Sequence, residues 1–134
     1  MNLPLNQVRG FAELGRALGR LTAFRDTLNA AGVTPLEYHA MLLVKTAPGE
    51  RITLGNLARR LNLQRSFCTR LAEKLVENAF AVRGPSPGVP DAVLQLSPRG
   101  EKILAAFAPR HLEELRCVEQ MLFAAAPPSR PCET

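Results

Sequence analysis

Residues 57–83 read LARRLNLQRSFCTRLAEKLVENAFAVR, the most informative segment of the chain for its architecture. Its apolar residues recur at helical spacing and predict a short helix over residues 54–61 and a second helix over residues 65–78. Asn62 and Leu63 leave room only for a tight connection between the two. Two short helices joined in this way are typical of a helix-turn-helix.

The second helix carries a polar face opposite its apolar one. Cys68, Leu71 and Leu75 share the apolar side, whereas basic and hydroxyl-bearing side chains fall on the other. Between residues 51 and 83 the chain holds seven basic residues against two acidic ones, and this segment accounts for the formal net charge of +5. Such a concentration suits a polyanion, although a solvated surface is the plainer interpretation.

Two further helices are predicted toward the N-terminus. Apolar side chains recur every three or four positions over residues 5–30, which is the stripe of a helix that packs along its whole length. Thr34, Pro35 and Glu37 then form a capping box with a proline in the first turn. They begin a helix that runs to about residue 46.

Toward the C-terminus the pattern changes to a short β-hairpin, the wing. Extended runs at residues 80–83 and 93–96 flank GPSPGVPDA (residues 84–92), which is too rich in proline and glycine for a helix. Ser97 and Pro98 then begin a last long helix, whose apolar residues recur at the spacing of a helix that packs along one face.

The predicted fold class is mainly α with a small β-hairpin, a winged helix-turn-helix with N- and C-terminal dimerisation helices. One domain is expected over residues 1–126. Within it, residues 34–97 form the DNA-binding lobe, and residues 5–30 and 98–126 form the dimerisation helices. Residues 127–134 are rich in proline and are expected to be disordered.

Three segments resemble the MarR family of bacterial regulators. Residues 57–83 resemble that family's LA-x-x-L core with the T-R pair that follows it, and LSPRGEKIL (residues 96–104) resembles its L-T-x-x-G segment. VTPLEYHAMLLV (residues 33–44) is similar to its L-T-x-x-Q/E element. These segments occur in the family's order and spacing, and the resemblance runs over nearly the whole chain.

The resemblance implies a homodimer in which the first and last helices of both subunits interleave. The apolar stripes on both terminal helices favour a partner independently, since one small lobe does not bury both. A symmetric dimer would present two recognition helices to a pseudo-palindromic DNA site. The expected interface residues are Leu14, Leu18, Leu115, Val118 and Leu122.

The start of the second helix-turn-helix helix is expected to contact DNA, because a helix N-terminus attracts phosphate. Gln64 is a poorer cap than the serine or aspartate usual in the family, but its amide suits adenine, and Arg65 or Arg70 suits guanine. Phe67 is expected either to touch a thymine methyl or to fold back against the wing. The predicted DNA-binding residues are Thr53, Asn56, Gln64, Arg65, Ser66, Phe67, Thr69, Arg70 and Lys74.

The wing departs from the family pattern. Members commonly carry Asp-x-Arg, whose arginine enters the minor groove, but here that position falls on Pro90, or on Val93 if the hairpin is shifted to use Asp91. No arginine occurs between Arg83 and Arg99. Asp91 is expected to be repelled by the DNA backbone, so the wing is predicted to add little to affinity.

Family members often bind small aromatic or phenolic acids between the dimerisation helices and the DNA-binding lobe. Phe11, Tyr38 and His39 are the candidates for such a pocket here. A place in the core is the alternative interpretation for these residues.

Other function classes find little support in the sequence. It contains no catalytic constellation, no Gly-rich phosphate loop and no metal-ligand spacing, so no enzyme activity, metal or cofactor is predicted. Cys68, Cys117 and Cys132 form neither a zinc pattern nor a disulfide framework, and the first two are expected to be buried. No apolar run approaches the roughly 18 residues of a membrane span, and the N-terminus lacks a secretory signal. A cytoplasmic location is therefore predicted.

The leading hypothesis is a sequence-specific DNA-binding transcriptional regulator, a homodimeric repressor. Release by a small ligand is left open. The alternative is a winged-helix dimer with weak or no operator binding that acts through protein contacts, as an antirepressor or co-regulator. The charge concentrated in residues 51–83 favours the first, and the wing without arginine favours the second.

Overall fold

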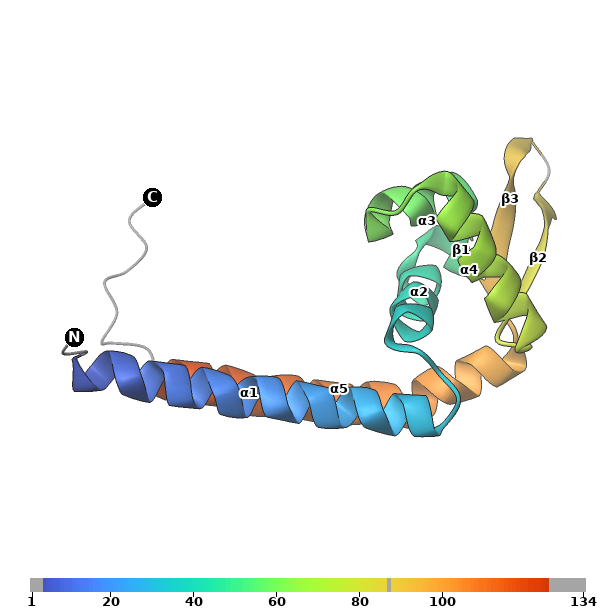
Figure 1. The fold of residues 1–134 in the computed structure, drawn as a ribbon. Helices are drawn as coiled ribbons and strands as arrows, with labels where there is room; N and C mark the ends of the chain where they lie inside the picture. The colour runs from blue at the N-terminus through green and yellow to red at the C-terminus, as the bar shows by residue number, and fades with distance from the viewer. Residues whose placement is uncertain (1–3, 87, 126–134) are drawn as a thin grey trace. The chain divides into compact units, whose positions relative to one another are not determined.

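The computed structural model describes residues 4–86 and 88–125 of the chain (Figure 1). Two compact units are present: residues up to Ala31 together with those from Ala108 onward form the helical-pair unit, and Gly32–Phe107 form the winged-helix unit. The predicted tail, residues 127–134, lies outside the described residues.

The elements are α1 (Leu5–Ala30), α2 (Pro35–Thr46), the 3-10 helix η1 (Pro48–Glu50), β1 (Arg51–Thr53), α3 (Leu54–Leu61), α4 (Arg65–Glu77), β2 (Ala81–Ser86), β3 (Val89–Leu96) and α5 (Pro98–Ala125). The five predicted helices are thereby confirmed.

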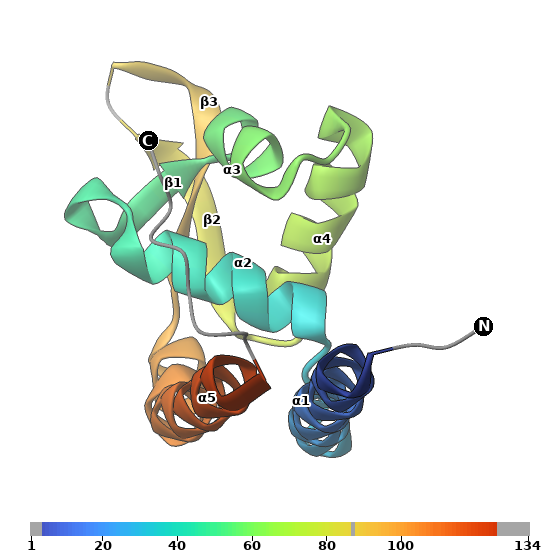
Figure 2. The ribbon, with the colours of Figure 1, turned by 90° about the vertical axis from the view of Figure 1, so that its left-hand side faces the viewer.

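The core of the winged-helix unit lies between α2, α3, α4 and one face of the sheet (Figure 2). Three helices and the sheet all contribute to it, so the helix-turn-helix is held by the same apolar contacts as the wing. Its most deeply buried side chains are Val33, Met41, Val44, Leu54, Leu57, Cys68, Leu75, Phe80 and Leu94.

The first turn of α2 is joined to the end of α4. The predicted capping box is confirmed: the Glu37 amide donates to Thr34 Oγ1 at 3.1 Å, and Glu37 Oε1 accepts from the Thr34 amide at 2.9 Å. The second carboxylate oxygen accepts from Asn78 Nδ2 at 3.0 Å. Glu37 is only 5% exposed, and these bonds account for both of its buried oxygens. The same residue thus caps α2 and holds the C-terminal end of α4.

The turn between α3 and α4 is as short as the sequence predicts. Asn62 adopts a left-handed conformation with φ of 56°, which asparagine tolerates better than most residues. The Leu63 amide donates to the carbonyl of Ala58 at 2.9 Å and so satisfies a free carbonyl at the end of α3. The chain then enters α4 directly after Gln64.

The sheet has a third strand, β1, that was not predicted from the sequence. Its order is β1-β3-β2, all antiparallel, and Ile52 of β1 lies opposite Leu94 of β3. This strand, β1, is short and directly precedes α3. Three residues are too few to show an alternating pattern, so pairing with β3 decides this segment.

The wing strands are longer than predicted. Residues 84–92 were expected to be a loop, but β2 continues to Ser86 and β3 begins at Val89, with Ser86 opposite Val89. Pro85 lies at a register irregularity on the edge strand β2, and Pro90 precedes the part of β3 that pairs with β1. A ladder tolerates a missing N–H at such places, so two prolines did not prevent strand formation.

The wing and α5 meet at a close backbone contact. The Ser97 amide donates to the Phe80 carbonyl at 3.0 Å, and Ser97 Oγ accepts from the Gly100 amide at 3.1 Å, as expected for a residue that caps α5. A Cβ added at Gly100 would stand 2.1 Å from the Phe80 carbonyl oxygen. This contact explains why a glycine occupies the first turn of the helix.

In the helical-pair unit, α1 and the C-terminal part of α5 lie side by side (Figures 1 and 2). The Arg20 guanidinium makes a two-point ion pair with Glu114, with N···O distances of 2.8 and 3.1 Å, and this hydrogen bonding raises the pKa of Arg20. The rings of Phe24 and His111 stack with their centroids 5.0 Å apart. These contacts fix the register of the two helices. No helix in the described part of the chain is long and apolar enough to cross a membrane.

Several apolar side chains of this pair remain exposed. Among the predicted interface residues, Leu14, Leu18 and Leu115 are exposed, whereas Val118 is already buried within the chain. The side chain of Leu122 lies outside the described part of the structure. The exposed apolar residues of the pair are Leu5, Val8, Phe11, Leu14 and Leu18 on α1, and Leu112, Leu115 and Phe123 on α5.

Candidate nucleic-acid interface

The N-terminal end of α4 is open to an anion. Gln64 stands at its N-cap, its side chain makes no capping hydrogen bond, and the first turn contains no acidic residue. The first backbone N–H groups of the helix therefore keep their partial positive charge for a ligand.

Most of the predicted DNA-binding residues lie on α3 and α4, which pack against each other, whereas Thr53 ends β1 and Gln64 is the N-cap of α4. Most of them are solvent-exposed, as a binding surface requires, and only Thr53 and Thr69 are half-buried. Phe67 stays 52% exposed and so is not buried against the wing within the chain. The exposed members are Asn56, Gln64, Arg65, Ser66, Phe67, Arg70 and Lys74.

Three of the predicted polar contacts already have local partners. Thr53 Oγ1 caps α3 by accepting from the Asn56 amide at 3.1 Å, and its O–H group stays able to donate to a phosphate. Asn56 Oδ1 accepts from Arg59. Thr69 Oγ1 donates to the Arg65 carbonyl at 3.0 Å, which leaves only its acceptor capacity for a ligand.

Arg65, at the first position of α4, is held by the wing. Its Nη2 forms an ion pair with Asp91 Oδ1, and Asp91 Oδ2 accepts from the Gly55 amide of α3 at 2.9 Å. A Cβ at Gly55 would lie 3.1 Å from that same oxygen, so the carboxylate occupies the space that a side chain would need. Both oxygens of Asp91 therefore have partners in the winged-helix unit, and its repulsion by the DNA backbone stays a prediction.

A groove of about 420 Å³ lies between the first turn of α2 and α4. Its wall includes the apolar side chains of Leu36, Phe67 and Leu71, and Arg70 and Lys74 supply two cations. The remaining lining residues are Thr34, Glu37 and Asn78. This combination suits a small molecule with an aromatic body and an anionic group.

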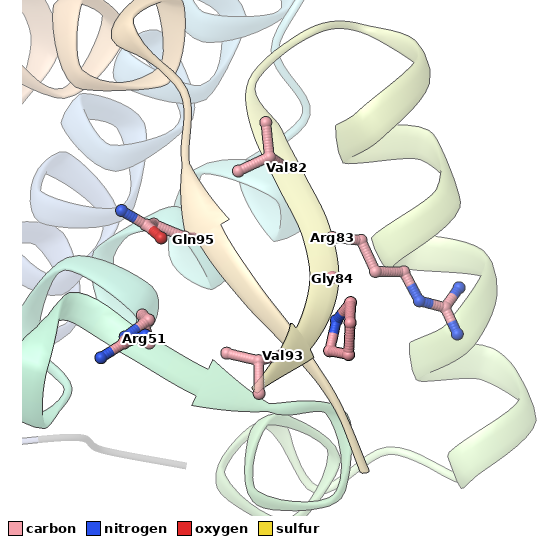
Figure 3. A pocket seen from close by; sticks show the side chains of 7 residues that line it. Arg51, Val82, Arg83, Gly84, Val93 and Gln95 are labelled. Carbon is pink, nitrogen blue, oxygen red and sulfur yellow. The ribbon is translucent and has the colours of Figure 1, made fainter. Parts of the chain in front are cut away.

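A smaller pocket of about 140 Å³ lies on the sheet (Figure 3). Arg51 and Gln95 lie on one side of it, whereas the Arg83 side chain extends on the side of α4, so the two arginines do not converge. It is therefore a shallow depression without a focused charge. Its lining residues are Arg51, Val82, Arg83, Gly84, Pro85, Val93 and Gln95.

The residues predicted for an effector pocket have different surroundings. Tyr38 is 4% exposed and belongs to the core, where burial raises the pKa of its hydroxyl. His39 is exposed on α2, and Phe11 is exposed on α1 in the helical-pair unit. Neither pocket described above includes any of the three. Their joint role in effector binding stays a prediction.

Cys68 is a core residue on the inner face of α4. Its Sγ lies 3.6 Å from the Leu54 carbonyl oxygen, and burial raises the pKa of the thiol. A thiol of raised pKa forms little of the reactive thiolate near neutral pH. The prediction that Cys68 is a buried small residue is confirmed, whereas Cys117 is only half-buried. Cys132 lies outside the described residues.

Residues 31–89 match the MarR family model, a segment that holds α2, the helix-turn-helix and the first wing strand, β2. This winged-helix segment is that of the MarR family. The match confirms the resemblance carried by the L-T-x-x-E element and the helix-turn-helix core.

Solved MarR-family regulators share this architecture beyond the matched segment. Sco3205 from Streptomyces coelicolor, solved in complex with DNA, is 21% identical with a TM-score of 0.64, covering 83% of this chain and 71% of its own. AbsC from the same organism is 16% identical with a TM-score of 0.70 and coverages of 96% and 86%. NadR, solved with 4-hydroxyphenylacetate, is 23% identical with a TM-score of 0.65 and coverages of 84% and 79%. No curated protein matches the sequence.

The role of Gly55 and the ion pair between Arg65 and Asp91 were not predicted from the sequence. Arg65 and Asp91 stand 26 positions apart, and no local pattern predicts contact at that separation. The available signal was the lone acid in a wing that lacks the family's arginine, opposite an arginine at the start of α4.

Proposed function

We propose that this protein is a sequence-specific DNA-binding transcriptional regulator that acts as a homodimeric repressor. The observation that carries the proposal is the exposed face of α4, where an uncapped helix N-terminus is followed by Ser66, Arg70 and Lys74. Such a helix offers N–H donors to phosphates and side chains to base edges in the major groove. The likeness to Sco3205, which was solved in complex with DNA, supports the same function.

Fluorescence anisotropy with labelled genomic fragments, measured at two salt concentrations, tests DNA binding directly. A binding constant that falls steeply with salt supports the proposal, because displaced counterions accompany every phosphate contact. No binding to any duplex at low salt would favour the alternative, a dimer that acts through protein contacts.

The dimer part of the proposal rests on the exposed apolar side chains of the helical pair. Each large aliphatic side chain left in water forgoes about 1.5–3 kcal/mol of burial free energy. Exposed apolar residues in the N-terminal half of α1, from Leu5 to Leu18, belong to this surface, together with Leu112 and Leu115 of α5. A second copy of the chain offers the same stripe and covers it by symmetry.

Leu18→Glu is expected to weaken the dimer by at least about tenfold, because a carboxylate buried in an apolar interface is costly. Sedimentation equilibrium at micromolar concentration should give about twice the monomer mass of 14.6 kDa for the unmodified protein and a lower mass for the variant. Ala23→Glu is the matched control, since Ala23 is exposed on the side of α1 opposite Leu14. An unmodified protein that sediments as a monomer would contradict the proposal.

We further infer release of DNA by a small aromatic acid that binds the groove between α2 and α4. Its apolar wall fits an aromatic ring, and Arg70 and Lys74 pair with a carboxylate. The groove shares these two cations with the predicted DNA face, so an occupant competes with phosphate for them. NadR, solved with 4-hydroxyphenylacetate, supports this ligand class.

In the same anisotropy assay, 4-hydroxyphenylacetate is expected to weaken DNA binding by the unmodified protein. Leu36→Glu places a carboxylate in the groove wall outside the predicted DNA face, and it should abolish the response without abolishing DNA binding. Leu36→Met is the control. A response that survives Leu36→Glu would contradict binding in this groove.

A further inference from the structure

Asp91 of the wing contacts both helices of the helix-turn-helix. Its carboxylate joins Arg65 at the start of α4 to the Gly55 amide in the first turn of α3. The Asp91 side chain is only 22% exposed, whereas that of Arg65 is 59% exposed. The acid therefore lies on the inner side of this contact and the guanidinium on its outer side.

We infer that Asp91 is a positioning residue that turns Arg65 from a general phosphate contact into a fixed, partly neutralised reader of base edges. The inference rests on the DNA-binding function proposed above. It assigns to the wing a part in specificity that does not require the minor-groove arginine of the family pattern.

The charges of the three groups support this role. A free arginine at a helix N-terminus adds a full positive charge where phosphates approach, and it binds any sequence. In the ion pair, the carboxylate offsets that charge as well as the partial positive charge at the start of α3. The pair therefore reduces the sequence-independent part of binding.

The geometry of Arg65 leaves it able to read a base. The ion pair uses Nη2, and a guanidinium carries five N–H donors in a planar fork. The remaining donors are held on an exposed side chain at the first position of α4, where recognition helices meet base edges. An arginine whose direction is fixed in the free protein loses less side-chain entropy when it binds.

The space around the contact is built for it. Gly55 donates its amide to the carboxylate, and a Cβ there would lie 3.1 Å from Asp91 Oδ2 and 3.4 Å from Arg65 Nη1. The backbone conformation does not require a glycine at position 55, because its φ is not positive. The close approach of the ion pair explains it.

Asp91→Asn tests the inference, since the amide keeps the shape and one acceptor for the Gly55 amide but loses the charge. Anisotropy with a mixed-sequence duplex should show affinity about three- to tenfold higher than that of the unmodified protein, and the slope of log K against log salt should steepen by about one unit. Glu77→Gln is the control, since it removes an exposed carboxylate from the other end of α4. In an Arg65→Ala background, the gain in affinity caused by Asp91→Asn should fall to the gain that Glu77→Gln causes.

A second pair of variants leaves Asp91 in place and so does not depend on the folding of Asp91→Asn. Arg65→Gln should reduce the salt slope on the mixed-sequence duplex by much less than Arg70→Gln, because Arg65 is already neutralised. Equal losses in the two would overturn the inference, as would an Asp91→Asn protein of unchanged circular dichroism that binds no more tightly. If the unmodified protein binds no duplex at low salt, the proposed function and this inference both fail.

Discussion

Gly100→Ala is expected to lower the melting temperature by roughly 10 °C, which corresponds to about 3 kcal/mol in a chain of this size. The added Cβ would stand 2.1 Å from the Phe80 carbonyl oxygen, so the backbone must move either at Phe80, just before β2, or at the start of α5. In an ordinary helix the same substitution stabilises by up to about 1 kcal/mol, so the sign of the effect is diagnostic. Thermal unfolding followed by circular dichroism measures it.

Gly84→Ala is the matched control for this substitution. Gly84 lies in β2 of the same unit, and a Cβ there would meet no atom within 4 Å. The control is expected to melt within a few degrees of the unmodified protein, because its added methyl group points into open space. Equal melting temperatures for the two variants would show that the contact between Gly100 and Phe80 does not constrain the fold.

Arg70→Ala is expected to weaken DNA binding by about tenfold to a hundredfold, which is the 1–3 kcal/mol of one base contact. Arg70 is exposed on α4 and lines the groove with Phe67 and Lys74. Its removal should leave the fold intact because it lies outside the core. Anisotropy on a selected genomic fragment measures the affinity for a specific site, and anisotropy on a mixed-sequence duplex measures the affinity for nonspecific DNA.

Arg70→Lys separates base contact from phosphate contact. A lysine keeps the charge but not the planar fork, so a base-reading Arg70 loses discrimination in both variants, whereas a phosphate-binding Arg70 is rescued by lysine. Arg116→Ala, which removes an exposed arginine from α5 in the helical-pair unit, controls for net charge. Arg70→Ala and Arg116→Ala proteins of equal affinity would remove α4 from the DNA face.

The helices were predictable because each carries its own boundary signals and its own periodicity. The Thr34–Glu37 capping box, the left-handed Asn62 and the Ser97 cap are local features, and they fixed three helix ends from neighbouring residues alone. The exposed face of α4 followed from the same periodicity, since apolar positions on one side leave the polar ones on the other.

The sheet and the wing contact were not predictable in this way. Ile52 is a strand residue only because Leu94 lies opposite it, and the strands of the wing extend past prolines that local rules assign to a loop. The partner of Arg65 could not be found from the sequence, because spatial neighbours far apart in the chain leave no periodic trace. Long-range pairing therefore accounts for each of these errors.

The close packing at Gly55 has a consequence for how this sequence can diverge. A side chain at position 55 competes for the same space as the Asp91 carboxylate, and Asp91 without Arg65 would leave a half-buried acid without its cation. Substitutions at the three positions are therefore not independent, because each alters the cost of the others. The three positions are therefore expected to change together in evolution. A relative with a larger residue at position 55 is expected to lack the acid in its wing. The first residue of its recognition helix would then lose the restraint that the acid provides.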